Sequence, residues 1–162
     1  MRQFDTSHRS APGRKAAHQA SILVVDPDPL SLIAMAGVLH TQGYRCTCAR
    51  TSDAAGQALR SARHDMLLWD VADDAAAVVE SLGTLRSTNG YQGLPAVLVA
   101  ESRWAGLERK TEAMSAPTRC LFKPIDPNAL IDVVENVLWL PALVSAHRRK
   151  GSTPSRPGWL TL

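Results

Sequence analysis

Three short, continuous apolar runs constrain the fold of this chain more than any other feature of the sequence. They are Ile22-Leu23-Val24-Val25, Met66-Leu67-Leu68-Trp69 and Ala96-Val97-Leu98-Val99. An unbroken run of this length is typical of a strand that is covered on both faces in a parallel sheet. Residues 44–49 alternate between polar and apolar side chains, which predicts a more exposed strand near a sheet edge, and residues 119–122 predict a fifth strand.

Segments with a helical period separate these predicted strands. Asp28 is a good N-cap before Pro29 at the first helical position, and Gly43 is placed to end the helix that follows. Apolar residues spaced three and four apart predict further helices over residues 55–62, 75–82 and 130–138. Residues 102–115 have the weakest helical pattern of the five segments.

Five strands that alternate with five helices predict a doubly wound α/β domain, because right-handed crossovers place helices on both faces of a parallel sheet. With two helices on one face and three on the other, the strand order 2-1-3-4-5 follows most easily. A functional site in such a sheet lies at the carboxyl ends of the strands, near the switch point between the first and third strands.

Length and charge predict one domain with two tails. The chain has 162 residues, which suits a single domain over residues 21–140. Residues 1–20 carry four basic side chains and one acidic, and residues 141–162 carry four basic and none acidic. Their Pro, Gly and Ser content predicts basic, disordered tails, and the alternative is a weak electrostatic contact with an acidic partner or nucleic acid.

The apolar runs, the N-terminal segment and the cysteines together predict a cytoplasmic protein. No apolar run approaches the roughly 18 residues of a membrane span, and the first 20 residues lack the apolar stretch of a secretory signal. Cys46, Cys48 and Cys120 show neither a CxxC motif nor zinc-site spacing, so we expect no disulfide and no structural metal.

Charged side chains follow the predicted strands at their carboxyl ends. Asp26 and Asp28 follow the first strand, Asp70 follows the third, and Lys123 follows the fifth. Carboxylates that converge repel one another unless a cation neutralises them, and oxygen-rich sites of this kind suit Mg²⁺. A carboxylate beside a metal and a lysine can accept a phosphoryl group, because both cations stabilise charge on the transferring oxygens.

At these residues the chain resembles the receiver domain of bacterial two-component response regulators. The resemblance covers about residues 21–140 and rests on four segments in the order and spacing of that family: residues 22–29, 65–71, 94–100 and 121–127. It implies the flavodoxin-like fold of that family. It implies that Asp70 is the phosphoacceptor, that Lys123 contacts the phosphate, and that Asp26 is the first of two adjacent acids at a Mg²⁺ site.

The chain also departs from the family's pattern, which implies an atypical member. Pro27 replaces the second acid, so we expect Mg²⁺ binding to be weak or absent, with Asp28 either a metal ligand or only the helix cap. Ala72 falls where the family supplies a backbone carbonyl to the metal. Ala100 replaces a serine or threonine, and Cys120 replaces the aromatic switch residue.

The resemblance implies a single-domain response regulator, not an enzyme, that accepts a phosphoryl group from a histidine kinase or phosphotransfer protein. We expect its output to be a protein contact through the last helix and Trp139, with a downstream target or in a homodimer. The alternative is a pseudo-receiver, a binding module that does not depend on phosphorylation. A flavodoxin is disfavoured because a Pro- and Asp-rich loop follows the first strand, and DNA binding because no recognition helix is predicted.

Overall fold

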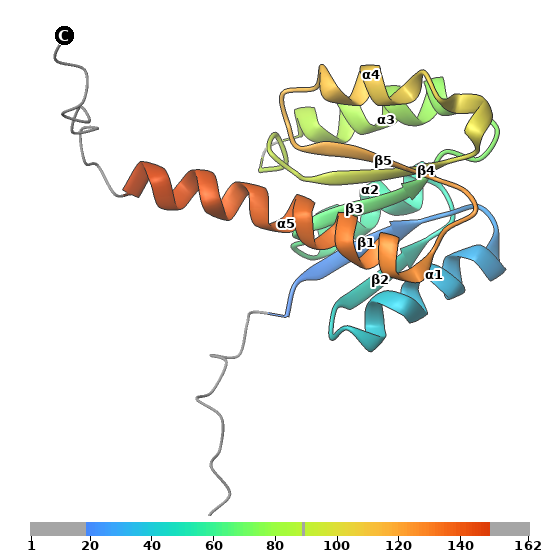
Figure 1. The fold of residues 1–162 in the computed structure, drawn as a ribbon, viewed down its shortest axis with the longest axis horizontal. Helices are drawn as coiled ribbons and strands as arrows, with labels where there is room; N and C mark the ends of the chain where they lie inside the picture. Colours follow the sequence, from blue (N-terminus) through green and yellow to red (C-terminus); the bar gives the residue numbers. More distant parts are fainter. Residues whose placement is uncertain (1–18, 89, 150–162) are drawn as a thin grey trace, which may run out of the picture.

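The three continuous apolar runs form the three central strands of a parallel sheet. The structure is a computed structural model that describes residues 19–88 and 90–149, with side chains up to residue 139. Its strands are β1 (Ser21–Val25), β2 (Arg45–Ala49), β3 (Met66–Asp70), β4 (Ala96–Ala100) and β5 (Thr118–Phe122). The strand order β2-β1-β3-β4-β5 confirms the predicted doubly wound, flavodoxin-like fold (Figure 1).

Helices follow the strands, and the first three begin at a residue whose side chain accepts a backbone N–H of the first turn. They are α1 (Pro29–Thr41), α2 (Ser52–Ser61), α3 (Ala75–Ser87), α4 (Leu107–Glu112) and α5 (Pro127–Arg149). Asp28 caps α1 through Oδ1, which accepts the Leu30 N–H at 2.9 Å. Gly43 follows α1 with a φ of +89°, a left-handed conformation that glycine adopts without steric cost.

Two apolar layers hold the helices against the sheet. α1 and α5 cover one face, where Leu32, Met35 and Leu130 pack against alternate residues of the central strands. α2, α3 and α4 cover the other face, where Leu59 and Leu82 pack against the remaining ones. This is the predicted arrangement of two helices on one face and three on the other. It leaves the carboxyl ends of the strands uncovered by helices, so these ends can hold a polar site.

The structure differs from the sequence prediction at two helices. Residues 102–115 split into a 3₁₀ turn, η1 (Ser102–Trp104), and the short α4, because Gly106 lies between them. The last helix continues to Arg149, past residue 140, where we expected the domain to end. Pro141 removes one N–H donor, but residues 142–149 contain no further glycine or proline. The proposed tails otherwise fall on residues 1–18 and 150–162, which lie outside the described residues.

Three further predictions concern the edge strand, the cysteines and membrane-spanning helices. β2 is mostly exposed, as expected for an edge strand, and the three cysteines of the chain are free thiols. Within residues 19–88 and 90–149, no helix is long and apolar enough to cross a membrane.

Candidate functional site

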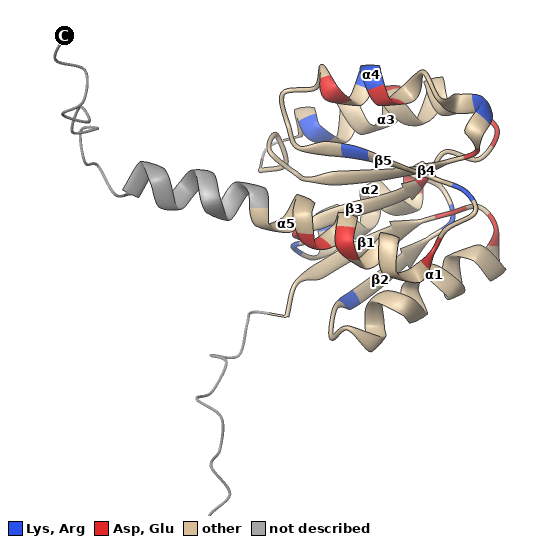
Figure 2. Cartoon of the chain, viewed as in Figure 1, with Lys and Arg blue, Asp and Glu red and all other residues tan. Residues whose placement is uncertain are grey.

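Two aspartates lie side by side at the carboxyl end of the sheet. Val25 of β1 pairs with Trp69 of β3, so Asp26 and Asp70 are the next residues on two neighbouring parallel strands. Both side chains are buried, with 1% and 2% of their surface exposed. Acidic and basic residues meet in the loops at this end of the sheet (Figure 2). The sheet therefore holds a buried acid pair at the predicted switch point.

Asp70 is held by one backbone group and one cation. Its Oδ1 accepts the Ala72 N–H at 2.8 Å, and its Oδ2 lies 2.6 Å from the Nζ of Lys123. Burial acts to lower the pKa of Lys123, but the hydrogen bond with Asp70 and the nearby acidic charges outweigh burial and raise that pKa. Lys123 thus remains a cation at neutral pH, as its predicted role requires.

The Asp26 carboxylate has fewer hydrogen-bond and ion-pair partners than the Asp70 carboxylate. Its Oδ1 accepts the Asp28 N–H at 2.8 Å, whereas its buried Oδ2 has no hydrogen-bond partner among the described residues. Burial raises the pKa of Asp26, and repulsion from Asp70 adds to that increase. The Ser31 side chain, the Asp28 N–H and Lys123 lower the pKa, but by less. Asp26 is therefore a carboxyl group whose ionisation is opposed by its surroundings.

Asp26 and Asp70 could supply carboxylate oxygens to Mg²⁺, whereas two other oxygens near them are already engaged in hydrogen bonds. Mg²⁺ requires near-octahedral coordination by oxygen atoms. Asp28 is exposed and its Oδ1 caps α1, while the Pro27 carbonyl accepts hydrogen bonds from the Nε and Nη2 of Arg50 at 3.2 and 3.0 Å. Across the described part of the chain, no three or more His, Cys, Asp or Glu side chains cluster in a way that could hold a metal ion. Within the described residues, Asp26 Oδ2 has no hydrogen-bond partner, whereas Asp70 Oδ2 forms the ion pair with Lys123.

Ala72 adopts a strained backbone conformation beside Asp70. Its φ is +49°, in the left-handed region that is costly for a residue with a Cβ atom. The hydrogen bond from its N–H to Asp70 Oδ1 accounts for the tight turn at this position. The predicted contribution of its carbonyl to a metal site stays a prediction.

We expect Ala72→Gly to raise the free energy of unfolding by about 1 kcal/mol, because glycine adopts this conformation without the steric cost. Urea denaturation measures the change. Ala76→Gly is the matched control, since Ala76 is exposed within α3 and the same replacement there lowers helix stability by roughly 0.5–1 kcal/mol. A loss of stability in Ala72→Gly similar to that of the control would contradict the assigned strain.

Ala100 and Cys120, two of the three positions at which the sequence departs from the receiver pattern, lie in apolar surroundings. Ala100 ends β4 and is only 1% exposed, and Cys120 on β5 is half-buried with its Sγ 3.6 Å from the Thr111 Oγ1. Burial raises the pKa of the Cys120 thiol. Neither side chain supplies a hydroxyl or an aromatic ring that could follow a phosphoryl group at Asp70.

Residues that the sequence pattern did not reveal surround the site. Arg103, in η1, pairs with Asp73 at 2.7 Å and with Glu101 at 3.2 Å, and its guanidinium lies 5.3 Å from the Trp104 ring centroid. These pairs are exposed, so each stabilises the fold by about 1 kcal/mol or less. They link the loops that follow β3 and β4. Arg50 reaches the Pro27 carbonyl from the loop after β2.

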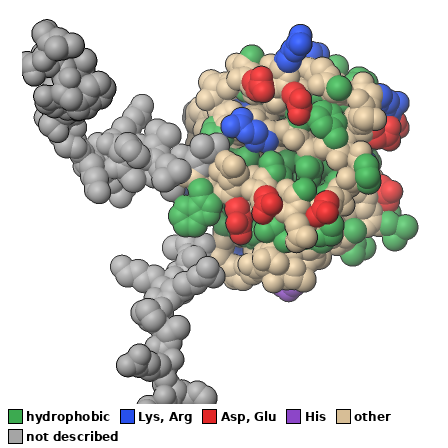
Figure 3. Space-filling view, viewed as in Figure 1, with side chains coloured by type: hydrophobic (Ala, Val, Ile, Leu, Met, Phe, Trp, Pro, Cys, Tyr) green, Lys and Arg blue, Asp and Glu red, His purple; other side chains and the backbone are tan. Residues whose placement is uncertain are grey.

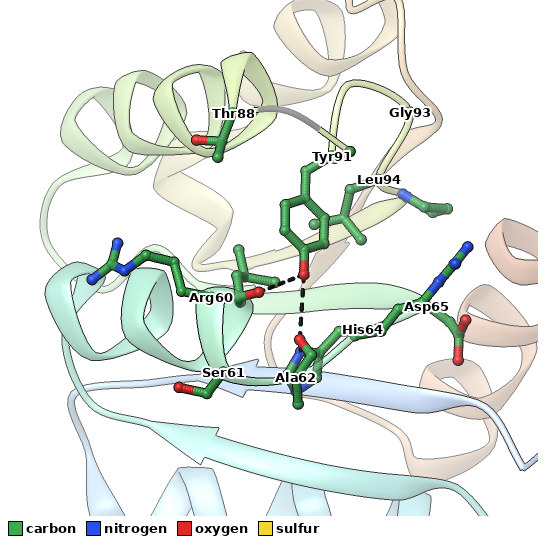
Figure 4. Close-up of a pocket in the computed structure, with 13 residues that line it drawn as sticks. Arg60, Ser61, Ala62, His64, Asp65, Thr88, Tyr91, Gly93 and Leu94 are labelled. Atoms are coloured by element: carbon green, nitrogen blue, oxygen red, sulfur yellow. Dashed lines mark hydrogen bonds between the residues drawn. The ribbon is translucent and has the colours of Figure 1, made fainter.

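A hollow of about 910 Å³ lies at the opposite end of the strands, before β3 and β4 (Figure 4). Tyr91 spans it, and its hydroxyl donates to the Leu59 carbonyl at 2.6 Å. His64 lines the same hollow with its Nδ1 3.0 Å from the Ala62 carbonyl, and burial lowers its pKa. The hollow shares no residue with the acid pair, so it is not part of the candidate site.

Known structures share this architecture, although no family model and no curated protein sequence matches the chain. The chemotaxis response regulator CheY4 of Vibrio cholerae is 23% identical with a TM-score of 0.65, over 74% of this chain and 98% of that one. NtrX from Brucella abortus is 21% identical with a TM-score of 0.72, over 81% of this chain and 29% of NtrX. A response regulator receiver domain protein from Clostridium thermocellum is 16% identical with a TM-score of 0.68, over 77% of this chain and 98% of that one. The chain therefore has the fold of response-regulator receiver domains.

Proposed function

We propose that this chain is a response-regulator receiver domain that accepts a phosphoryl group at Asp70 from a histidine kinase or phosphotransfer protein. The observation that carries the proposal is the 2.6 Å ion pair between Asp70 and Lys123, at the carboxyl end of a receiver-like sheet and beside Asp26. A buried carboxylate paired with a lysine is a nucleophile whose charge is already compensated. The same lysine can then neutralise the charge of the transferred group.

The reaction needs no general base. A carboxylate oxygen of Asp70 attacks phosphorus of a donor phosphohistidine whose second ring nitrogen carries a proton, while the bond between phosphorus and the first ring nitrogen breaks and its electron pair stays on that nitrogen. The products are an acyl phosphate on Asp70 and a neutral imidazole. Lys123 stabilises the oxygens of the phosphoryl group during transfer, because its ammonium lies at the carboxylate that receives the group.

The surface next to the site suits a protein partner. Leu30 and Ile33 on α1 are 78% and 67% exposed, and an apolar groove beside them is lined by Met35, Lys123 and Ile125. Apolar side chains are visible on the face of the molecule drawn in Figure 3. Trp139 on α5 is 63% exposed, which supports the expected output contact through the last helix.

A phosphorylation-independent binding module is the second candidate function. Ala100 and Cys120 favour it, because a phosphoryl group at Asp70 would meet neither a hydroxyl nor an aromatic ring that could change position. A ligand shifts a conformational equilibrium only through its differential affinity for the two states. In this candidate the Trp139 surface binds its partner at all times.

Incubation with a small-molecule phosphodonor, followed by intact-protein mass spectrometry, distinguishes the two candidates. We expect the wild-type chain to gain one phosphoryl group and Asp70→Asn to gain none. Asp132→Asn is the matched control, because Asp132 is an exposed carboxylate on α5 away from the acid pair. A wild-type chain that stays unmodified, or equal modification of Asp70→Asn, would refute phosphoryl transfer at Asp70 and favour the binding module.

A further inference from the structure

A glutamate lies beside Lys123 at the carboxyl end of the sheet. Ala100 of β4 pairs with Phe122 of β5, and the Lys123 N–H donates to the Ala100 carbonyl at 2.9 Å. Glu101 and Lys123 are therefore the next residues on two neighbouring parallel strands. Burial acts to lower the pKa of Lys123, and the charge of Glu101 joins that of Asp70 in raising it. Lys123 thus has a second carboxylate near its ammonium group.

Arg103 binds this glutamate and connects it to the neighbouring loop. The Arg103 Nε lies 3.2 Å from a carboxylate oxygen of Glu101, and its Nη2 lies 2.7 Å from Asp73, in the loop that follows β3. The guanidinium also lies 5.3 Å from the ring centroid of Trp104, the last residue of η1. Negative and positive groups therefore alternate from Asp73 through Arg103 and Glu101 to Lys123.

Two carboxylates can compete for one ammonium group. The Lys123 side chain is 36% exposed, and a lysine ammonium on its flexible four-carbon stem can turn toward either partner. Asp70 holds it at 2.6 Å, but an uncompensated Glu101 would attract it away from Asp70. Such a charge would also repel an anionic phosphoryl donor. The ion pair with Arg103 reduces both effects, because it offsets the charge of Glu101.

We propose that Arg103 and Glu101 are positioning residues of the phosphoryl site: Arg103 offsets the charge of Glu101, so that the Lys123 ammonium stays at Asp70. This inference rests on the proposed function and adds a regulatory ion pair to it. A partner or ligand that withdraws Arg103 from Glu101 would slow phosphoryl transfer. This role requires no contact between either residue and the transferred group.

The test measures the rate at which the full chain takes up a phosphoryl group from acetyl phosphate in the presence of Mg²⁺. A carboxylate oxygen of Asp70 attacks phosphorus, and acetate leaves with the electron pair of the broken bond between phosphorus and oxygen. We expect Arg103→Met to be slower than the wild type by roughly 2–5-fold, the range for an exposed ion pair. Methionine keeps an apolar contact with Trp104. Glu101→Gln should be no slower than the wild type, and the variant with both replacements should recover the wild-type rate.

Further measurements separate positioning from a structural role. Arg109→Met and Glu112→Gln are the matched controls, since both residues are exposed on α4, and they should leave the rate unchanged. In about 1 M salt the difference between Arg103→Met and the wild type should shrink, because the Debye length falls to about 3 Å. An NMR titration of the Lys123 ammonium should give a higher pKa in Arg103→Met than in the wild type, and a lower pKa in Glu101→Gln.

The outcomes distinguish this inference from the proposed function. If the variant with both replacements is as slow as Arg103→Met, Arg103 acts without Glu101 and the inference is refuted. An unchanged pKa of Lys123 in both single variants refutes it as well. Either result leaves the proposed function intact when the wild type is phosphorylated at Asp70. A wild-type chain that accepts no phosphoryl group refutes both the inference and the proposed function.

Discussion

Replacing Arg86 with methionine is expected to lower the free energy of unfolding by about 2–3 kcal/mol, because it removes three hydrogen bonds to backbone carbonyls and leaves the buried Leu94 carbonyl without a donor. Arg86, in the last turn of α3, is only 9% exposed. Its Nε and Nη2 donate to the Leu94 carbonyl at 3.0 and 2.7 Å, and Nη2 also donates to the Pro117 carbonyl at 3.2 Å. Arg86 thus joins α3 to the segments that lead into β4 and β5.

The loss of these hydrogen bonds outweighs the gain from removing a buried charge. Burial lowers the pKa of Arg86 to about 10, which shows that the guanidinium is held at a cost. However, a hydrogen bond from a charged donor stabilises a protein by roughly 1.5–3 kcal/mol, and methionine offers no donor to either carbonyl. Methionine keeps the apolar volume of the side chain, so the effect of packing is small.

Urea denaturation of three variants measures this effect. Arg109→Met is the matched control, because Arg109 is exposed on α4 and its replacement should change stability by less than about 0.5 kcal/mol. Arg86→Lys should be intermediate, because an ammonium lacks the planar fork that spans two carbonyls. Arg86→Met with the stability of the control would contradict the structural role assigned to Arg86.

Replacing Asp26 with asparagine is expected to stabilise the chain at neutral pH by roughly 1–2 kcal/mol. Asparagine keeps an oxygen that can accept the Asp28 N–H, and it removes a buried charge that lies next to Asp70. Burial and the charge of Asp70 raise the pKa of Asp26 above its ordinary value of 3.8. The native state therefore binds the proton more tightly than the unfolded chain does.

The sign of the pH dependence follows from this difference. As the pH rises above 3.8, the unfolded chain ionises first and the wild type loses stability until the pH exceeds the raised pKa in the native state. The advantage of Asp26→Asn should be complete above that raised pKa and should disappear below about pH 3.8. Urea denaturation of the wild type and the variant at several pH values gives the difference directly.

Asp28→Asn is the matched control for this prediction. Asp28 is exposed and caps α1, and asparagine caps a helix as well as aspartate does. We therefore expect almost no change in stability from this variant at neutral pH. If Asp26→Asn were less stable than the wild type at neutral pH, the ionised Asp26 would contribute favourable contacts that outweigh its burial.

The sequence by itself determined the sheet and the identity of the acid pair. The continuous apolar runs 22–25, 66–69 and 96–99 predict central strands because both of their faces must be buried, and the alternating pattern of residues 44–49 predicts an edge. Parallel strands bring their carboxyl ends to one edge, so the positions of Asp26, Asp70 and Lys123 in the sequence are enough to predict that they meet. The sheet is thus predicted from the local periodicity, and the site from the order of the strands.

Only the tertiary structure shows which further side chains hold the loops and helices in place. Arg50 and Arg86 look like ordinary exposed basic residues in the sequence, and Arg86 follows the usual preference for a cation in the last turn of a helix. Their partners are the backbone carbonyls of Pro27, Leu94 and Pro117, which any residue type provides. Because every residue type has a backbone carbonyl, the amino-acid sequence does not reveal which carbonyl an arginine will contact. The left-handed turn at Ala72 is hidden for the same reason, since the conformation is imposed by the hydrogen bond to Asp70 and not by a glycine.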